Sequence, residues 1–132
     1  MEKSRILIVD DDEELVKILS FNLNIEGYTV STAFDGMSAV MRAHKDKPDL
    51  ILLDIIMPGG DGFNVMEKLN ISTKTCTIPV IMLSGIPKDE LGEKALEAGV
   101  QNYFTKPFDM EELMNHIKGL LVERKERQVA SI

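Results

Sequence analysis

Short apolar runs alternate along this chain with longer stretches in which apolar residues recur at helical spacing. The runs are continuously apolar, which is typical of parallel strands that are covered on both faces. We expect five such strands, at residues 6–9, 28–33, 50–53, 80–83 and 103–104, the last being the weakest.

A helical pattern follows each run. In the first, at residues 13–26, Leu15, Leu19 and Leu23 share one stripe and Gly27 is placed as the C-terminal cap. The other four are expected at about 36–45, after Asp61, between Pro87 and Gly99, and from the capping box of Asp109 and Glu112 onwards. Five strand–helix repeats predict an α/β fold: a doubly wound, five-stranded parallel sheet with helices on both faces.

Length, charge and cysteine content limit the function classes. The 132 residues fit one domain, and the net charge of −7 without a basic stripe argues against nucleic acid as a direct partner. No apolar run approaches the roughly 20 residues that span a bilayer, and the lone Cys76 suits a reducing compartment. We therefore expect a soluble, cytoplasmic domain at residues 1–122, followed by a charged helical extension or tail at residues 123–132.

Polar side chains come directly after four of the five runs. Asp10 and Asp11 follow the first, Asp54 the third and Ser84 the fourth, and the fifth continues through Thr105 to Lys106. The carboxyl ends of parallel strands lie at one edge of the sheet, where open α/β folds bind ligands. Three carboxylates, a hydroxyl and an ammonium group are thus expected to converge.

Crowded carboxylates at one edge repel one another, and a divalent cation would resolve that conflict. Oxygen-only ligands in an incomplete cage suit Mg²⁺ better than Ca²⁺, and the absence of His and Cys at these strand ends disfavours zinc. Asp12, next in sequence, is better explained as the N-cap of the first helix.

Asp54 is the candidate nucleophile, because a Pro/Gly-rich loop follows it and keeps the carboxylate at the rim of the sheet. Taken alone, Ser84 could be an ordinary strand-end hydroxyl and Lys106 a solvated lysine. At one edge with Asp54, they become donors for a phosphoryl group.

With these residues in this order, the chain resembles the receiver domain of two-component response regulators, in its stand-alone, chemotaxis-like form. The matching segments are residues 6–11, 48–54, 57–62, 79–85 and 104–108. The resemblance implies a flavodoxin-like sheet of strand order 2-1-3-4-5. It also implies a signalling protein that is not an enzyme, except that it catalyses its own phosphorylation and dephosphorylation.

The resemblance assigns Asp54 as the phospho-acceptor and Mg²⁺ as the cofactor. Asp11, Asp54 and the backbone carbonyl of Ile56 would ligate the ion directly, and Asp10 would act mainly through water.

The same resemblance gives roles to the later residues. Lys106 would contact the phosphoryl oxygens, Ser84 would be drawn toward them, and Tyr103 would be the switch aromatic that turns inward when Ser84 moves. The Lys106–Pro107 peptide bond is expected to be cis.

A sensor histidine kinase or a histidine phosphotransfer protein would be the phosphoryl donor. The changed surface, formed by the fourth helix, fifth strand and fifth helix, would bind a downstream output protein or domain, and a phosphorylation-dependent homodimer remains open. As an alternative, the chain is the N-terminal receiver half of a longer response regulator with an output domain.

Two finer hypotheses concern apolar residues outside the main core pattern. The first helix carries a second apolar strip beside its leucines: Ile18, Phe21 and Ile25. The resemblance makes Ile18 with Asn22 a kinase-docking patch, together with Pro107 and Phe108, although burial against neighbouring helices competes with this interpretation.

The second hypothesis concerns Ile56 and Ile86, which lie two residues after Asp54 and Ser84. Neither side chain can orient a hydrolytic water, so we expect slow loss of phosphate. Simple packing of the loops is the alternative.

Two other classes share parts of this pattern. A haloacid-dehalogenase-type phosphatase would need a second acid where this chain has Ile56. A flavodoxin-like flavin carrier needs a phosphate-binding first loop, whereas residues 10–14 are all acidic.

Overall fold

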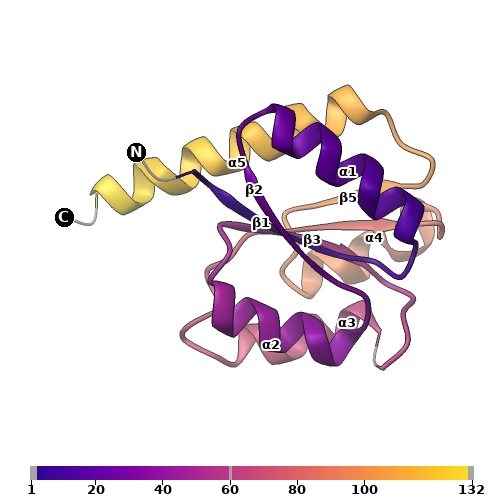
Figure 1. The fold of residues 1–132 in the computed structure, drawn as a ribbon. Coiled ribbons are helices and arrows are strands. Elements are labelled where there is room, and N and C mark those ends of the chain that lie inside the picture. Colours follow the sequence, from indigo (N-terminus) through magenta and orange to yellow (C-terminus); the bar gives the residue numbers. More distant parts are fainter. Residues whose placement is uncertain (1–2, 60, 131–132) are drawn as a thin grey trace.

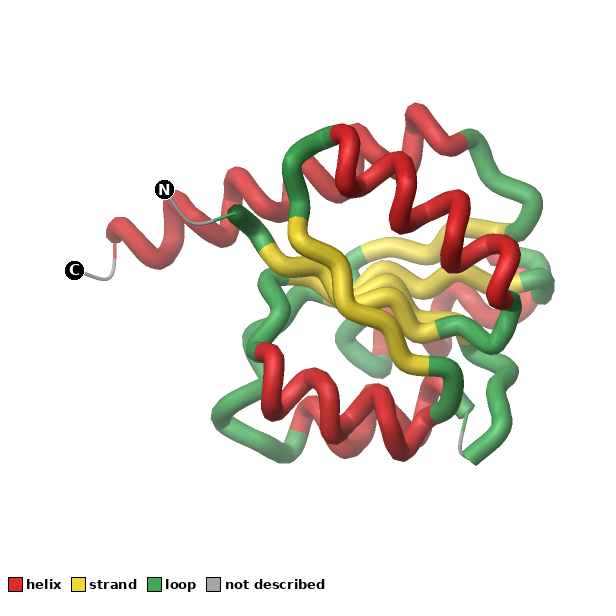
Figure 2. Tube along the Cα trace, viewed as in Figure 1, coloured by secondary structure: helices red, strands yellow, loops and turns green. Residues whose placement is uncertain are grey.

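Five parallel strands form the central layer of the molecule, for which a computed structural model describes residues 3–59 and 61–130 (Figures 1 and 2). The spatial order is β2-β1-β3-β4-β5, which confirms the order implied by the resemblance. The strands are β1 (Arg5–Val9), β2 (Thr29–Ala33), β3 (Leu50–Asp54), β4 (Val80–Ser84) and β5 (Asn102–Thr105). All four pairings are parallel, so every strand ends at the same edge of the sheet.

Helices cover both faces of this sheet, as predicted. Figure 1 shows α1 and α5 on one face and α2, α3 and α4 on the other. The helices are α1 (Glu13–Ile25), α2 (Gly36–Asp46), α3 (Gly62–Asn70), α4 (Lys88–Glu97) and α5 (Met110–Ala130).

The alternation of side chains along each strand explains the continuously apolar runs. In β1, Leu7 and Val9 pack in the core beneath α2 and α3, whereas Ile6 and Ile8 pack beneath α1 and α5. All four side chains are buried. Because both faces of the sheet are covered, both alternating sets of side chains in the middle of the strand are apolar.

Local sequence signals set the helix ends that follow the strands. Asp12, Asp35 and Asp61 each cap the helix after them through a side-chain oxygen that accepts a backbone N–H. Gly27 has φ +92°, a left-handed conformation that suits glycine after the end of α1. Asp109 accepts a hydrogen bond from the backbone N–H of Glu112 at 3.1 Å, which confirms its predicted capping role.

Helix α5 continues past residue 122 without a break and reaches Ala130. Arg124 fixes this part of the helix, since its side chain donates to the carbonyl of Thr77 at 2.9 Å and lies 3.6 Å from Asp49. Residues 131 and 132 of the predicted extension lie outside the described residues. None of the helices in the described part of the chain has both the length and the apolar composition that crossing a bilayer would require.

Candidate functional site

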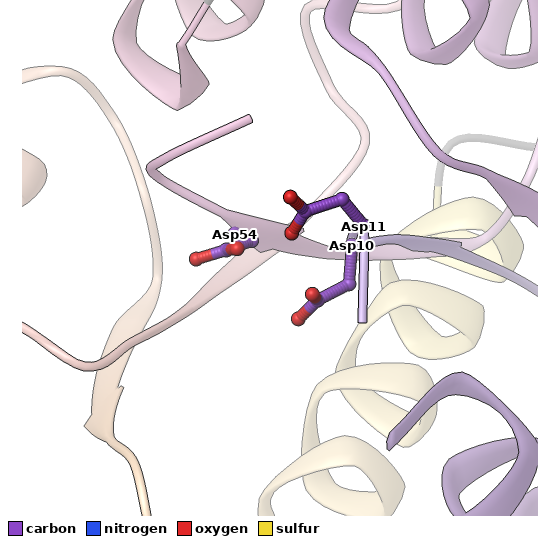
Figure 3. A group of neighbouring side chains, drawn as sticks. All are labelled: Asp10, Asp11 and Asp54. Carbon is purple, nitrogen blue, oxygen red and sulfur yellow. The ribbon is translucent and has the colours of Figure 1, made fainter. Parts of the chain in front are cut away.

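Three carboxylates meet at the carboxyl edge of the sheet, as the sequence predicts. Asp10 and Asp11 follow β1, and Asp54 ends the neighbouring strand β3 (Figure 3). One oxygen from each carboxylate lies within 4.8 Å of the others. Two full charges at that separation repel by about 3 kcal/mol at an effective dielectric constant of roughly 20, so this grouping requires compensating positive charge.

Asp10 is held in place by the start of α1. Its side chain is buried, and Oδ1 accepts the backbone N–H of Asp12 at 2.9 Å. Asp12 in turn accepts the N–H of Leu15 at 3.2 Å, so it is the helix cap that the sequence indicated. Asp11 lies between them with an exposed side chain, free to face a ligand.

Lys106 reaches the same site from the end of β5. Its Nζ donates to Oδ2 of Asp10 at 2.7 Å and lies 3.6 Å from Oδ2 of Asp54. The Lys106–Pro107 peptide bond is cis, as expected. Three carboxylates and one ammonium group leave a formal charge of −2 when all are ionised, which matches a divalent cation.

The environment of the carboxylate cluster changes the pKa of Asp54. Burial, and then the charge of Asp10, raise the pKa of Asp54 from its usual 3.8 to about 6, against the opposing effect of Lys106. For Lys106, burial acts to lower the pKa, but the hydrogen bond to Asp10 and the nearby charges of Asp54 and Asp10 outweigh it and raise the pKa. The phospho-acceptor candidate is thus a carboxylate whose negative charge is poorly stabilised by the protein alone.

Ser84 and Tyr103 both contact the connection that follows β4. The buried Ser84 hydroxyl oxygen accepts the backbone N–H of Ile86 at 3.1 Å. The Tyr103 hydroxyl donates to the carbonyl of Ile86 at 2.6 Å, and the residue is only 3% exposed. The predicted switch aromatic is therefore already in an inward position in this structure.

Among the residues that the structure describes, no hydrogen bond or ring contact joins the side chains of the remaining predicted residues to the acidic cluster. Ile56 lies beyond β3 with its side chain 63% exposed. Ile18 is 53% exposed on α1, and its carbonyl accepts the side-chain amide of Asn22 at 2.8 Å. Pro107 is exposed, and the half-buried Phe108 ring packs edge-on against Phe104.

Gly62 is a site residue that sequence reasoning treated only as part of a loop. A Cβ at this position would lie 2.7 Å from the carbonyl oxygen of Asp54 and 2.9 Å from Cα of Ile55. Its N–H also donates to the carbonyl of Ile55 at 2.7 Å. Gly62 therefore lets the start of α3 pack directly on the backbone that carries Asp54, a contact that only the fold reveals.

The donor set fits the expected metal. All three side chains offer carboxylate oxygens, which are hard ligands of the kind that Mg²⁺ prefers, and their combined charge is not neutralised by Lys106.

The family model described as the response regulator receiver domain matches residues 6–118. Among curated proteins, the chain is 39% identical over 117 residues to the DNA-binding dual master transcriptional regulator RpaA of Synechocystis, covering 89% of this chain and 48% of that protein. It is 43% identical over 119 residues to the response regulator PleD of Caulobacter vibrioides, covering 89% and 26% respectively. The chain thus spans half or less of the length of these relatives.

A solved structure supports the fold independently. The CheY-like response regulator receiver domain protein of Methanospirillum hungatei JF-1 superposes with a TM-score of 0.87 at 29% identity, over 96% of this chain and 99% of that one.

The raised pKa of Asp54 predicts a pH-dependent site. In the metal-free protein, the Asp54 carboxyl should titrate near pH 6 in a carbon-detected NMR titration assigned with Asp54→Asn. Because the folded pKa exceeds the usual 3.8, the folded state retains this proton as pH rises from about 4 to 6, so this residue's contribution to the free energy of unfolding falls over that window. Lys106→Met should raise the midpoint further, and Mg²⁺ should lower it. A midpoint near 4 in the metal-free wild type would contradict the prediction.

Proposed function

The chain belongs to the response regulator receiver domain family, and from that premise we propose that it is a signalling switch that accepts a phosphoryl group on Asp54. The observation that carries the proposal is the cluster of Asp10, Asp11 and Asp54 with Lys106 between two of its members, at the ligand-binding edge of the sheet. Burial of two like charges close together destabilises a fold, so the positions of Asp10 and Asp54 are explained by function and not by stability.

Asp11 and Asp54, with the carbonyl of Ile56, would hold Mg²⁺ directly and Asp10 mainly through water, and the ion would supply positive charge for the carboxylates and for an incoming phosphoryl group. An oxygen of Asp54 attacks phosphorus in line, and the bond from phosphorus to the imidazole nitrogen of a phosphohistidine breaks as the new bond forms. The imidazole leaves with the electron pair and takes up a proton from solvent. The protein contributes mainly position and charge to this step.

Lys106 and Ser84 are the residues that respond to the product. The Lys106 ammonium lies 2.7 Å from Asp10 here, and we propose that it turns to the phosphoryl oxygens, which carry more negative charge. Ser84 accepts a hydrogen bond from Ile86, which leaves its O–H free to donate to the same oxygens. These contacts would shift the population of protein conformations, and the shift would change the surface formed by α4, β5 and α5.

The proposed partners are a sensor histidine kinase or a phosphotransfer protein upstream, and an output protein or domain downstream. Residues 1–122 form the proposed receiver. The chain is either a stand-alone cytoplasmic receiver or the receiver part of a longer regulator, and the greater length of the relatives is compatible with both. The words "DNA-binding" in the name of RpaA describe that protein.

Phosphorylation is the direct test. Incubation with Mg²⁺ and acetyl phosphate or phosphoramidate should add the mass of one phosphoryl group, as measured by intact-mass spectrometry. Asp54→Ala should remain unmodified, whereas Asp89→Asn, a change in an exposed acidic residue of α4, should be modified like the wild type. A wild-type chain unmodified by either donor, or an Asp54→Ala chain modified equally, would overturn the proposal.

The phosphorylated form should lose its phosphate slowly. The side chains of Ile56 and Ile86 cannot orient water for attack on phosphorus, so Ile56→Asn should shorten the half-life several-fold by supplying a polar group. The half-life is followed by the decay of the phosphorylated mass after removal of the donor. A wild-type half-life of seconds would show that the apolar residues do not protect the phosphoryl group.

Docking of the kinase is proposed to use Ile18 and Asn22 on α1, with Pro107 and Phe108. Ile18 is 53% exposed, so Ile18→Asp should leave the fold and the reaction with acetyl phosphate intact while slowing transfer from the cognate kinase about tenfold or more. Ile71→Asp is the matched control, because Ile71 is 82% exposed at the end of α3. Equal transfer rates for Ile18→Asp and the wild type would exclude the patch.

A further inference from the structure

Helix α4 begins without a cap of its own. Its N-cap residue is Pro87, which makes no side-chain capping bond, whereas α1, α2 and α3 each begin with a capping aspartate. The helix has 10 residues and includes Gly92, which disfavours helical structure. The backbone N–H of Lys88, the first helical residue, instead donates at 3.1 Å to the hydroxyl oxygen of Thr105 on β5. A neighbouring strand therefore fixes the start of α4.

Alternation along β5 explains why Thr105 can do this. Tyr103 and Thr105 are two residues apart in a strand, so their side chains point to the same face of the sheet. Tyr103 belongs to the core beneath α4, whereas Phe104 packs in the core on the other face. The hydroxyl groups of both Tyr103 and Thr105 thus face the chain that leads into α4.

The end of β5 holds that chain at three successive points. The backbone N–H of Lys106 donates to the carbonyl of Ser84 at 2.7 Å, Tyr103 donates to the carbonyl of Ile86, and Thr105 accepts from Lys88. The hydroxyl of Thr105 and the ammonium of Lys106 come from consecutive residues. The ammonium of Lys106 faces the acidic cluster and the hydroxyl of Thr105 anchors α4, so one short segment of backbone carries both.

We propose that Thr105 is a positioning residue that couples the phosphoryl site to the first turn of α4. This inference rests on the proposed function, because it needs Lys106 to shift from Asp10 to a phosphoryl group. When the end of β5 adjusts to that shift, the bond from Lys88 to Thr105 carries the start of α4 with it. Without the hydroxyl, Asp54 still accepts phosphate, but α4 loses its link to the site.

The test is backbone amide exchange of residues 88–91, measured with and without Mg²⁺ and phosphoramidate, with intact mass reporting phosphorylation in every sample. In the free protein, Thr105→Val should exchange the Lys88 amide about fivefold faster than the wild type, the ratio expected for loss of a helix cap. The difference between the free and phosphorylated forms, present in the wild type, should disappear. Thr105→Ser should behave as the wild type, and Thr29→Val on the edge strand β2 should change neither quantity.

A double variant separates coupling from simple helix stability. Pro87→Asp in the Thr105→Val background supplies α4 with a cap of its own, which accepts from the backbone N–H groups of the second and third helical residues, so it should restore slow exchange at residues 89 and 90 but not the response to phosphorylation. If it restores both, Thr105 is only a helix cap and the inference is wrong. Wild-type-like exchange in Thr105→Val has the same consequence.

The two proposals fail in different ways. A wild-type chain that gains no phosphate overturns the proposed function, and the coupling with it. A wild-type chain that is phosphorylated, but whose α4 response survives in Thr105→Val, overturns the coupling alone.

Discussion

Electrostatic repulsion at the edge of the sheet is the constraint on which the functional part of this molecule depends. Asp10, Asp11 and Asp54 bring three carboxylates within 4.8 Å, and the ammonium group of Lys106 beside them offsets a single charge. Burial, and then the charge of Asp10, raise the pKa of Asp54 to about 6, and the remaining negative charge leaves the cluster complementary to a divalent cation. The site is thus strained by charge until a ligand relieves it.

The rest of the fold makes this arrangement tolerable. Strands β1 and β3, which lead to the aspartates, pack against the cores on both faces of the sheet, and this close packing holds the backbone segments that carry the carboxylates in place despite the repulsion. Asp10 is fixed by the N–H of Asp12, and Gly62 lets α3 pack against the carbonyl of Asp54. Rigid supports on both sides keep the charges together, which is the general condition for a pre-organised site.

The end of β5, from which Lys106 reaches the aspartates, also links the site to the start of α4. Tyr103 and Thr105 of β5, and Lys106 directly after the strand, contact the segment from Ser84 to Lys88 through side-chain and backbone hydrogen bonds. The side chain of Lys106 extends from there to the aspartates. In the coupling we propose, a change of charge at Asp54 would act on a strand end that is bonded to the start of α4. Coupling of this kind needs no long pathway, because one short segment borders both regions.

The sequence by itself determined the elements and the residues of the site. Continuous apolar runs, capping aspartates and strand-end polar residues depend on local chemistry, and Asp10, Asp11, Asp54 and Lys106 converge because parallel strands share one edge. Only the tertiary structure decided which partners meet across that edge. That Lys106 pairs with Asp10, that Tyr103 is inward and that Thr105 caps α4 depend on distances between residues remote in sequence, which no local pattern encodes.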